Sequence, residues 1–136
     1  MSYQRVSRQE YLNALDGFSE GADLALMHPG ITPSAEAHFT GRRDGVAAAK
    51  AAVTTDFSST KSWLERYSGR LKTLVQQSRR LERQASANSY DKAYYGGKAA
   101  SIQEIKDYVD VFSLNRKWPI WRRKLTQLFG NGANRR

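Results

Sequence analysis

The residue types that usually carry out catalysis or bind metals are sparse in this chain and poorly spaced for either task. The two histidines, His28 and His38, lie ten residues apart, and neither has the partner four positions away that a helical zinc site needs. There is no cysteine, which excludes disulfides, thiolate zinc sites and cysteine nucleophiles. No serine stands in a Gly-x-Ser-x-Gly setting, and the carboxylates are scattered. The sequence therefore predicts no catalytic residue, metal or cofactor, and a protein that is not an enzyme.

The run Gly96-Gly97-Lys98 matches only the end of a phosphate-binding loop. The first glycine of that motif should stand at position 92, which is Lys92, and a Ser or Thr should stand at position 99, which is Ala99. The stretch 90–98 combines tyrosines with lysines, a composition that suits single-stranded nucleic acid, where rings stack on bases. Tyrosines that pack a loop onto the rest of the protein are the alternative interpretation.

Basic residues are in surplus, and the surplus lies in the second half of the chain. The 136 residues carry 22 Lys and Arg against 13 Asp and Glu, a formal net charge of +9. Residues 1–57 hold five basic and seven acidic side chains, whereas residues 58–136 hold seventeen and six. From Arg116 onward there are seven basic residues and no acidic one. This distribution favours partners such as nucleic acid, acidic protein or an anionic membrane surface.

The apolar residues recur with a helical period nearly throughout, and no segment alternates as a β-strand would. The predicted helices cover about Arg8–Met27, Pro33–Val53 and Thr60–Ala87, a fourth that starts at Ser101, and Pro119–Phe129. The stretch between residues 88 and 100 is predicted to be a connection. We therefore expect an all-α protein, a small bundle of about five helices with one long central helix. Residues 1–115 would form the bundle, and residues 116–136 a basic C-terminal helical arm with a flexible tail.

Helix starts are marked by capping residues. In a capping box, a Ser and a Glu three residues later each bond to a backbone N–H at the start of the helix. Ser7 with Glu10 is predicted to begin the first helix in this way, and Ser101 with Glu104 the fourth. Thr32 followed by Pro33 is predicted to begin the second.

Two kinds of residue are candidates for contacts between helices or between subunits. Glycines and alanines recur every three or four positions in the first two predicted helices, so that two backbones can approach closely. The third predicted helix has an apolar seam with a 3.5-residue period. The predicted interface residues are Gly17, Gly21, Gly41, Gly45, Leu64, Tyr67, Leu71, Leu74, Trp118, Trp121 and Leu125. For the glycines, packing of the first helix on the second is the main interpretation; a subunit contact and a turn over 41–45 that splits the second helix are the alternatives.

The predicted core is thin. Leu, Ile, Val and Phe together supply 26 of 136 residues, about 19 %, which lies just below the level of about 20 % at which a highly charged chain is suspected of disorder. Small and aromatic residues would have to complete the core. Burial against a partner would compensate, so we expect a homo-oligomer or a subunit of a complex.

The basic residues suggest the partner. A helical wheel of the third predicted helix places two bands of cations away from the apolar seam: Lys61, Lys72, Arg79 and Arg83 in one, and Arg66, Arg70 and Arg80 in the other. The residues we expect to contact phosphates are Arg79, Arg80, Arg83, Lys92, Lys98, Arg116, Lys117, Arg122, Arg123 and Lys124. No base-reading motif is present, so binding would not be sequence-specific.

The sequence thus predicts a non-enzymatic protein that self-associates or joins a larger complex and contacts nucleic acid phosphates. One alternative is a purely structural subunit, for example of a phage virion or packaging machinery, whose basic face binds acidic protein. Another is a membrane-surface protein that uses Trp118, Trp121 and Phe129. No run approaches the roughly 18 apolar residues of a membrane span, and residues 1–10 lack a secretory apolar block. We expect a cytoplasmic protein, or one inside a virion if it is encoded by a phage.

Overall fold

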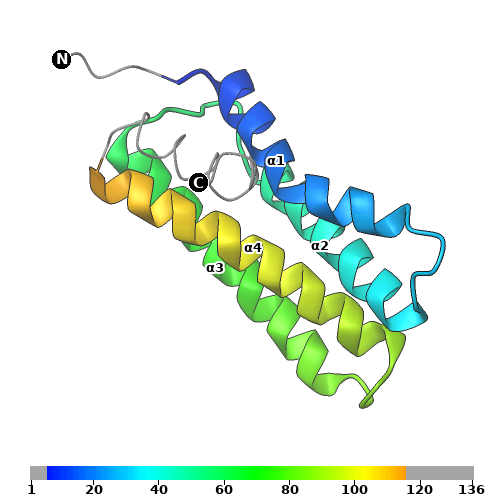
Figure 1. Ribbon diagram of the computed structural model, residues 1–136. Helices are drawn as coiled ribbons and strands as arrows, with labels where there is room; N and C mark the ends of the chain where they lie inside the picture. The colour runs from blue at the N-terminus through cyan, green and yellow to red at the C-terminus, as the bar shows by residue number, and fades with distance from the viewer. Residues whose placement is uncertain (1–5, 116–136) are drawn as a thin grey trace.

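Four α-helices make up most of the chain that the computed structural model describes, residues 6–115 with side chains through residue 111. They are α1 (Arg8–Leu26), α2 (Pro33–Ala51), α3 (Lys61–Gln84) and α4 (Tyr90–Asn115) (Figure 1). The described residues contain no β-strand, which confirms the all-α prediction. They hold four helices and not about five, since the predicted helix at Pro119–Phe129 and the arm 116–136 lie outside them. None of the helices in the described range is long and apolar enough to cross a membrane.

Capping side chains explain where the first three helices begin. Ser7 Oγ accepts a hydrogen bond from Glu10 N at 3.0 Å, and Glu10 Oε1 accepts one from Ser7 N at 2.9 Å, which is the predicted capping box. Thr32 caps α2, with Pro33 as the first helical residue, as predicted. Thr60 caps α3. The bounds of these three helices agree with the prediction to within three residues.

The prediction for the fourth helix is wrong about its start, because α4 begins at Tyr90 and not at Ser101. Ser101 lies inside the helix, where its Oγ donates to Lys98 O at 3.1 Å, so the predicted capping box does not form. The stretch 88–100, predicted to be a connection, is therefore almost entirely helical. The true turn between α3 and α4 covers residues 85–89.

The four helices are arranged around a close contact between α2 and α4, which run parallel (Figure 1). α1 packs antiparallel on α2, and α3 packs antiparallel on α4. α1 and α3 therefore lie on opposite sides of the α2–α4 pair, although they meet near their starts, where Tyr11 contacts Tyr67 edge-on at 5.8 Å. α1 has little contact with α4.

Glycines permit the close approach of α2 and α4. A Cβ atom added to Gly41 would lie 1.9 Å from the carbonyl oxygen of Tyr94. A Cβ added to Gly97 would lie 2.0 Å from the carbonyl oxygen of His38. Both distances are far shorter than any real carbon–oxygen contact, and in both cases the obstacle is backbone. Gly97 thus serves the packing of α4 on α2 and not a turn, which is why the prediction of a connection failed.

The small-residue stripe of α2 faces α4 and not α1, which corrects the main interpretation of the glycines. Gly41 and Gly45 are buried against α4, whereas a Cβ on Gly21 of α1 would meet no atom within 4 Å. α1 does pack on α2, but not through paired glycine stripes. The alternative of a turn over 41–45 is also wrong, because α2 runs unbroken through it.

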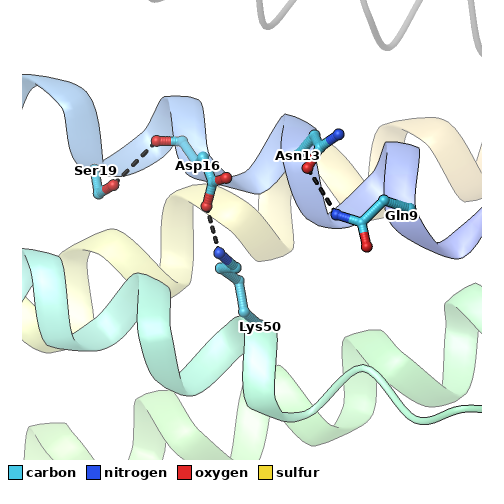
Figure 2. Close-up of polar contacts among 5 residues, drawn as sticks. All are labelled: Gln9, Asn13, Asp16, Ser19 and Lys50. Carbon is cyan, nitrogen blue, oxygen red and sulfur yellow. Dashed lines mark hydrogen bonds and ion pairs between the residues drawn. The ribbon is translucent and has the colours of Figure 1, made fainter.

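Polar contacts join α1 to α2 and to the loop that follows α2. Lys50 of α2 pairs with Asp16 of α1, as Figure 2 shows. The guanidinium of Arg8 donates to the carbonyl oxygens of Val53 at 3.1 Å and Thr54 at 3.0 Å. Within α1, the exposed Gln9 Nε2 donates to Asn13 Oδ1 at 2.9 Å (Figure 2).

Aromatic side chains fill the core where the start of α1, the loop after α2 and the start of α3 meet. Trp63 stacks on Tyr67 with ring centroids 5.2 Å apart and meets Phe57 edge-on at 4.7 Å. Tyr11 stacks on Phe57 at 5.0 Å. The Tyr67 hydroxyl donates to Ala49 O at 2.6 Å and so ties α3 to the end of α2.

Candidate nucleic-acid interface

The solvent side of α3 carries half of the Lys and Arg side chains in the described residues. This 24-residue helix has seven Lys and Arg against two carboxylates. Its opposite side is the predicted apolar seam, in which Leu64, Tyr67 and Leu71 are fully buried. We call the cationic side the α3 cationic face. Its members are Lys61, Arg66, Arg70, Lys72, Arg79, Arg80 and Arg83.

Most of the α3 cationic face is not neutralised by the chain's own carboxylates. Lys61 lies 3.7 Å from Glu65, and Arg79 lies 2.8 Å from Glu82. The cations that make no ion pair within the described residues are Arg66, Arg70, Lys72, Arg80 and Arg83. The rest of the chain offers them no acidic side chain, since residues 1–5 and 112–136 contain neither Asp nor Glu.

The two outer helices of the bundle carry opposite charge. α1 has four carboxylates and one arginine, whereas α3 has the seven cations just described. Because α1 and α3 lie on opposite sides of the α2–α4 pair (Figure 1), the molecule has an acidic edge and a basic edge. Charge separation on this scale orients a polyanion toward one face.

The predicted phosphate contacts Arg79 and Lys92 meet where the last turn of α3 lies beside the first turn of α4. Lys92 Nζ donates to Glu82 O at 3.1 Å. Together with His38 they line a shallow hollow of about 400 Å³. Because the Glu82 carboxylate pairs with Arg79 inside this hollow, the hollow has less positive charge to offer an anion than the exposed part of the face has.

His38 also lines a second shallow hollow, of about 410 Å³, between α1, α2 and α4. There Arg42 and Glu104 form an ion pair at 2.6 Å. Burial lowers the pKa of His38, and the charge of Arg42 lowers it further against the opposing effect of Glu104. The described residues hold no group of three or more His, Asp or Glu that could bind a metal ion.

The tyrosines of residues 90–98 lie on α4 and not on a loop. Tyr90 is 50 % exposed, and its ring stacks on that of Tyr94 with centroids 6.4 Å apart and planes 14° apart. The Tyr94 hydroxyl donates to Asp44 Oδ2 of α2 at 2.5 Å. Tyr95 meets Tyr94 edge-on at 5.1 Å. Lys98, another predicted phosphate contact, is partly buried on the same helix.

Alkaline pH should destabilise the protein through these and the core tyrosines. Burial raises the pKa of Tyr67 above its usual value, and burial with the bond to Asp44 raises the pKa of Tyr94 to about 12. A tyrosine with a raised pKa holds its proton more tightly when folded. Its contribution to stability is therefore complete below about pH 10 and is lost as the pH rises through the folded-state pKa.

We therefore expect the free energy of unfolding to fall between about pH 10 and pH 12, and the Tyr94→Phe variant to show a smaller fall. Denaturant titrations across this range, with tyrosinate absorbance recorded in parallel, measure both effects. An identical pH profile for wild type and Tyr94→Phe would contradict the prediction.

The predicted interface residues in the described helices differ in how deeply they are buried. Those fully covered within the chain are Gly41, Gly45, Leu64, Tyr67 and Leu71. Gly17 and Leu74 are partly buried, and Gly21 is exposed. The predicted residues Trp118, Trp121, Leu125, Arg116, Lys117, Arg122, Arg123 and Lys124 lie outside the described residues.

Three cations of α3 are among the predicted phosphate contacts, and other cations of this helix are equally exposed. Arg66, Arg70 and Lys72 are all exposed, with Arg66 and Arg70 in one of the two cationic bands and Lys72 in the other. Their positions outside the apolar seam on the helical wheel are the signal that predicts their exposure. Tyr90 is not among the predicted contacts, because its four-residue spacing from Tyr94 has meaning only once α4 is extended back to Tyr90.

The described chain is thus an all-α bundle of four helices with one cationic outer helix. In comparisons with known proteins, the chain matches no protein-family model, no curated protein and no solved structure.

Proposed function

We propose that this protein is a non-enzymatic helical binding protein that contacts nucleic acid phosphates through the α3 cationic face. In this proposal it self-associates or belongs to a larger complex. The observation that carries the proposal is the set of five exposed cations on α3 that form no ion pair within the described residues. Residues 116–124 would add five more cations in a stretch with no acidic residue.

The physical basis is the release of counterions. A 24-residue helix is about 36 Å long, so cations along one side can follow the phosphates of about one turn of a duplex. Each neutralised phosphate releases condensed cations, which makes affinity fall steeply with salt. Cations already paired within the protein release less, so the unpaired members of the face should dominate.

The test is binding to a fluorescently labelled duplex of about 20 base pairs, measured by anisotropy at 50 and 200 mM salt. With six to ten phosphate contacts, the affinity should fall by about three to five decades between these concentrations. The Arg80→Gln/Arg83→Gln variant should lower the slope of log affinity against log salt by about 2.

The matched control is Lys50→Gln/Lys106→Gln, which removes the same net charge from α2 and α4. Lys50 pairs with Asp16, and Lys106 pairs with Asp110 at 2.8 Å, so neither is an unpaired member of the α3 cationic face. Exposed pairs of this kind contribute about 0–1 kcal/mol to stability, so the fold should survive. No binding of the duplex or of a single strand of the same length at 50 mM salt, or an equal change of slope in both variants, would rule out the proposal.

The opposite charges of α1 and α3 favour a second candidate, a structural subunit whose basic face binds acidic protein. The acidic α1 of a second copy could itself be such a partner, in a head-to-tail contact that builds rings or filaments. Mass measurement in solution separates the candidates. Assembly that dissolves with salt and is unaffected by nucleic acid supports the structural subunit, and assembly that requires nucleic acid supports the first proposal.

A further inference from the structure

The ring of Tyr90 lies nearly parallel to that of Tyr94 and is half-exposed. Its partner ring, Tyr94, is held by the hydrogen bond to Asp44 at 2.5 Å and by the close approach of the Tyr94 backbone to Gly41. The two rings are nearly parallel, with 14° between their planes. Because Tyr90 is 50 % exposed, a further flat ring can extend this stack on the outer side.

Cations lie on α4 and on the last turn of α3 at the same end of the bundle. Tyr90, Tyr94 and Lys98 are spaced four residues apart and so form one row along α4. The contact from Lys92 Nζ to Glu82 O places the first turn of α4 beside the last turn of α3, which carries Arg80 and Arg83. A chain of phosphates that follows the α3 cationic face can therefore reach the end of the bundle where Tyr90 lies.

We infer that Tyr90 is a stacking platform for an unpaired base, and that the preferred ligand is single-stranded nucleic acid. The inference rests on the proposed function and specifies its ligand. Every base has a flat face, so such a platform binds single strands without regard to sequence. In a duplex the bases are already stacked on one another, so the ring can add nothing there. Stacking does not distinguish DNA from RNA, so the Tyr90 ring should contribute equally to the binding of single-stranded DNA and single-stranded RNA.

The test uses the full chain with two probes at one low salt concentration. One is a labelled oligothymidylate of about 20 nucleotides, and the other is a duplex of the same length. Tyr90→Ala should weaken binding of the oligothymidylate by about 5- to 150-fold, the effect typical of losing one stacked base. Binding of the duplex should change by less than about twofold.

Two further substitutions at the same position control for loss of bulk and loss of the hydroxyl. Tyr90→Leu keeps an apolar side chain without a ring and should behave like Tyr90→Ala. Tyr90→Phe keeps the ring and should bind like wild type. Because Tyr90 is half-exposed, these variants should fold, and circular dichroism checks that they do.

The outcomes separate this inference from the proposed function. If the wild type binds the duplex but not the oligothymidylate, or if Tyr90→Ala weakens both probes equally or neither, the stacking platform is wrong while the phosphate interface stands. If the wild type binds neither probe at low salt, the proposed function fails and this inference fails with it.

Discussion

Replacing Trp63 with alanine should lower the free energy of unfolding by about 3–5 kcal/mol. Trp63 is 2 % exposed and lies between Phe57 and Tyr67, at 4.7 and 5.2 Å. Its removal would leave a cavity at the point where α3, the loop after α2 and the start of α1 meet. The free energy of unfolding of a small domain is about 5–15 kcal/mol, so this one substitution would remove a large part of it. Denaturant unfolding followed by circular dichroism measures it.

The control for Trp63→Ala is Leu24→Ala on α1. Leu24 is 70 % exposed, so its truncation should change stability by no more than about 0.5 kcal/mol. A loss at Trp63 as small as that at Leu24 would mean that the aromatic cluster is not the core of the folded protein.

Replacing Gly41 with alanine should destabilise the protein by about 1–3 kcal/mol, although alanine is the better helix former. The added methyl would lie 1.9 Å from the carbonyl oxygen of Tyr94, and neither a methyl nor a backbone oxygen can rotate away. α4 would have to move off α2, and the packing around their contact would open. The propensity gain of about 1 kcal/mol is too small to offset this.

The same Gly→Ala substitution should stabilise the protein where no other atoms lie next to the glycine. A Cβ on Gly21 or on Gly69 would meet no atom within 4 Å. Gly21→Ala and Gly69→Ala should therefore stabilise the protein by about 0.5–1 kcal/mol each. Denaturant midpoints of the three variants suffice for the comparison, and a Gly41→Ala protein as stable as Gly21→Ala would refute the close contact between α2 and α4.

Local signals in the sequence were enough to predict the first three helices. The Ser7–Glu10 box and Thr32 with Pro33 each act through bonds to residues three positions away, so their effect is visible without the fold. The apolar seam of α3 was visible for the same reason, because a 3.5-residue period implies one buried side wherever that side packs.

The start of α4 and the partner of the α2 glycines could not be predicted, because both depend on contacts between residues far apart in the sequence. Gly96 and Gly97 have the composition of a turn, and only the position of His38 on α2 explains why a helix needs a glycine at position 97. In the same way, the stripe of Gly41 and Gly45 indicates that some backbone comes close, but not which one. Both errors arise from the same α2–α4 contact.

The candidate interface was predictable in its charge but not in its detail. The surplus of cations on the third helix was visible from composition and from the helical wheel. The sequence does not show which of these cations form ion pairs. Within the described residues Arg79 pairs with Glu82, whereas Arg80 and Arg83 form no ion pair. The role inferred for Tyr90 depends on its exposure and on the anchored ring of Tyr94, which no spacing rule supplies.

The contact between α2 and α4 also bears on how the chain folds. Each of the hairpins α1–α2 and α3–α4 joins neighbours in sequence and can form quickly from local contacts. Bringing Gly41 to Tyr94 closes a loop that contains the whole of α3, so it costs more conformational entropy than either hairpin. We therefore expect the meeting of the two preformed hairpins to be the slowest event in folding, and the glycines to set its rate as well as the final stability.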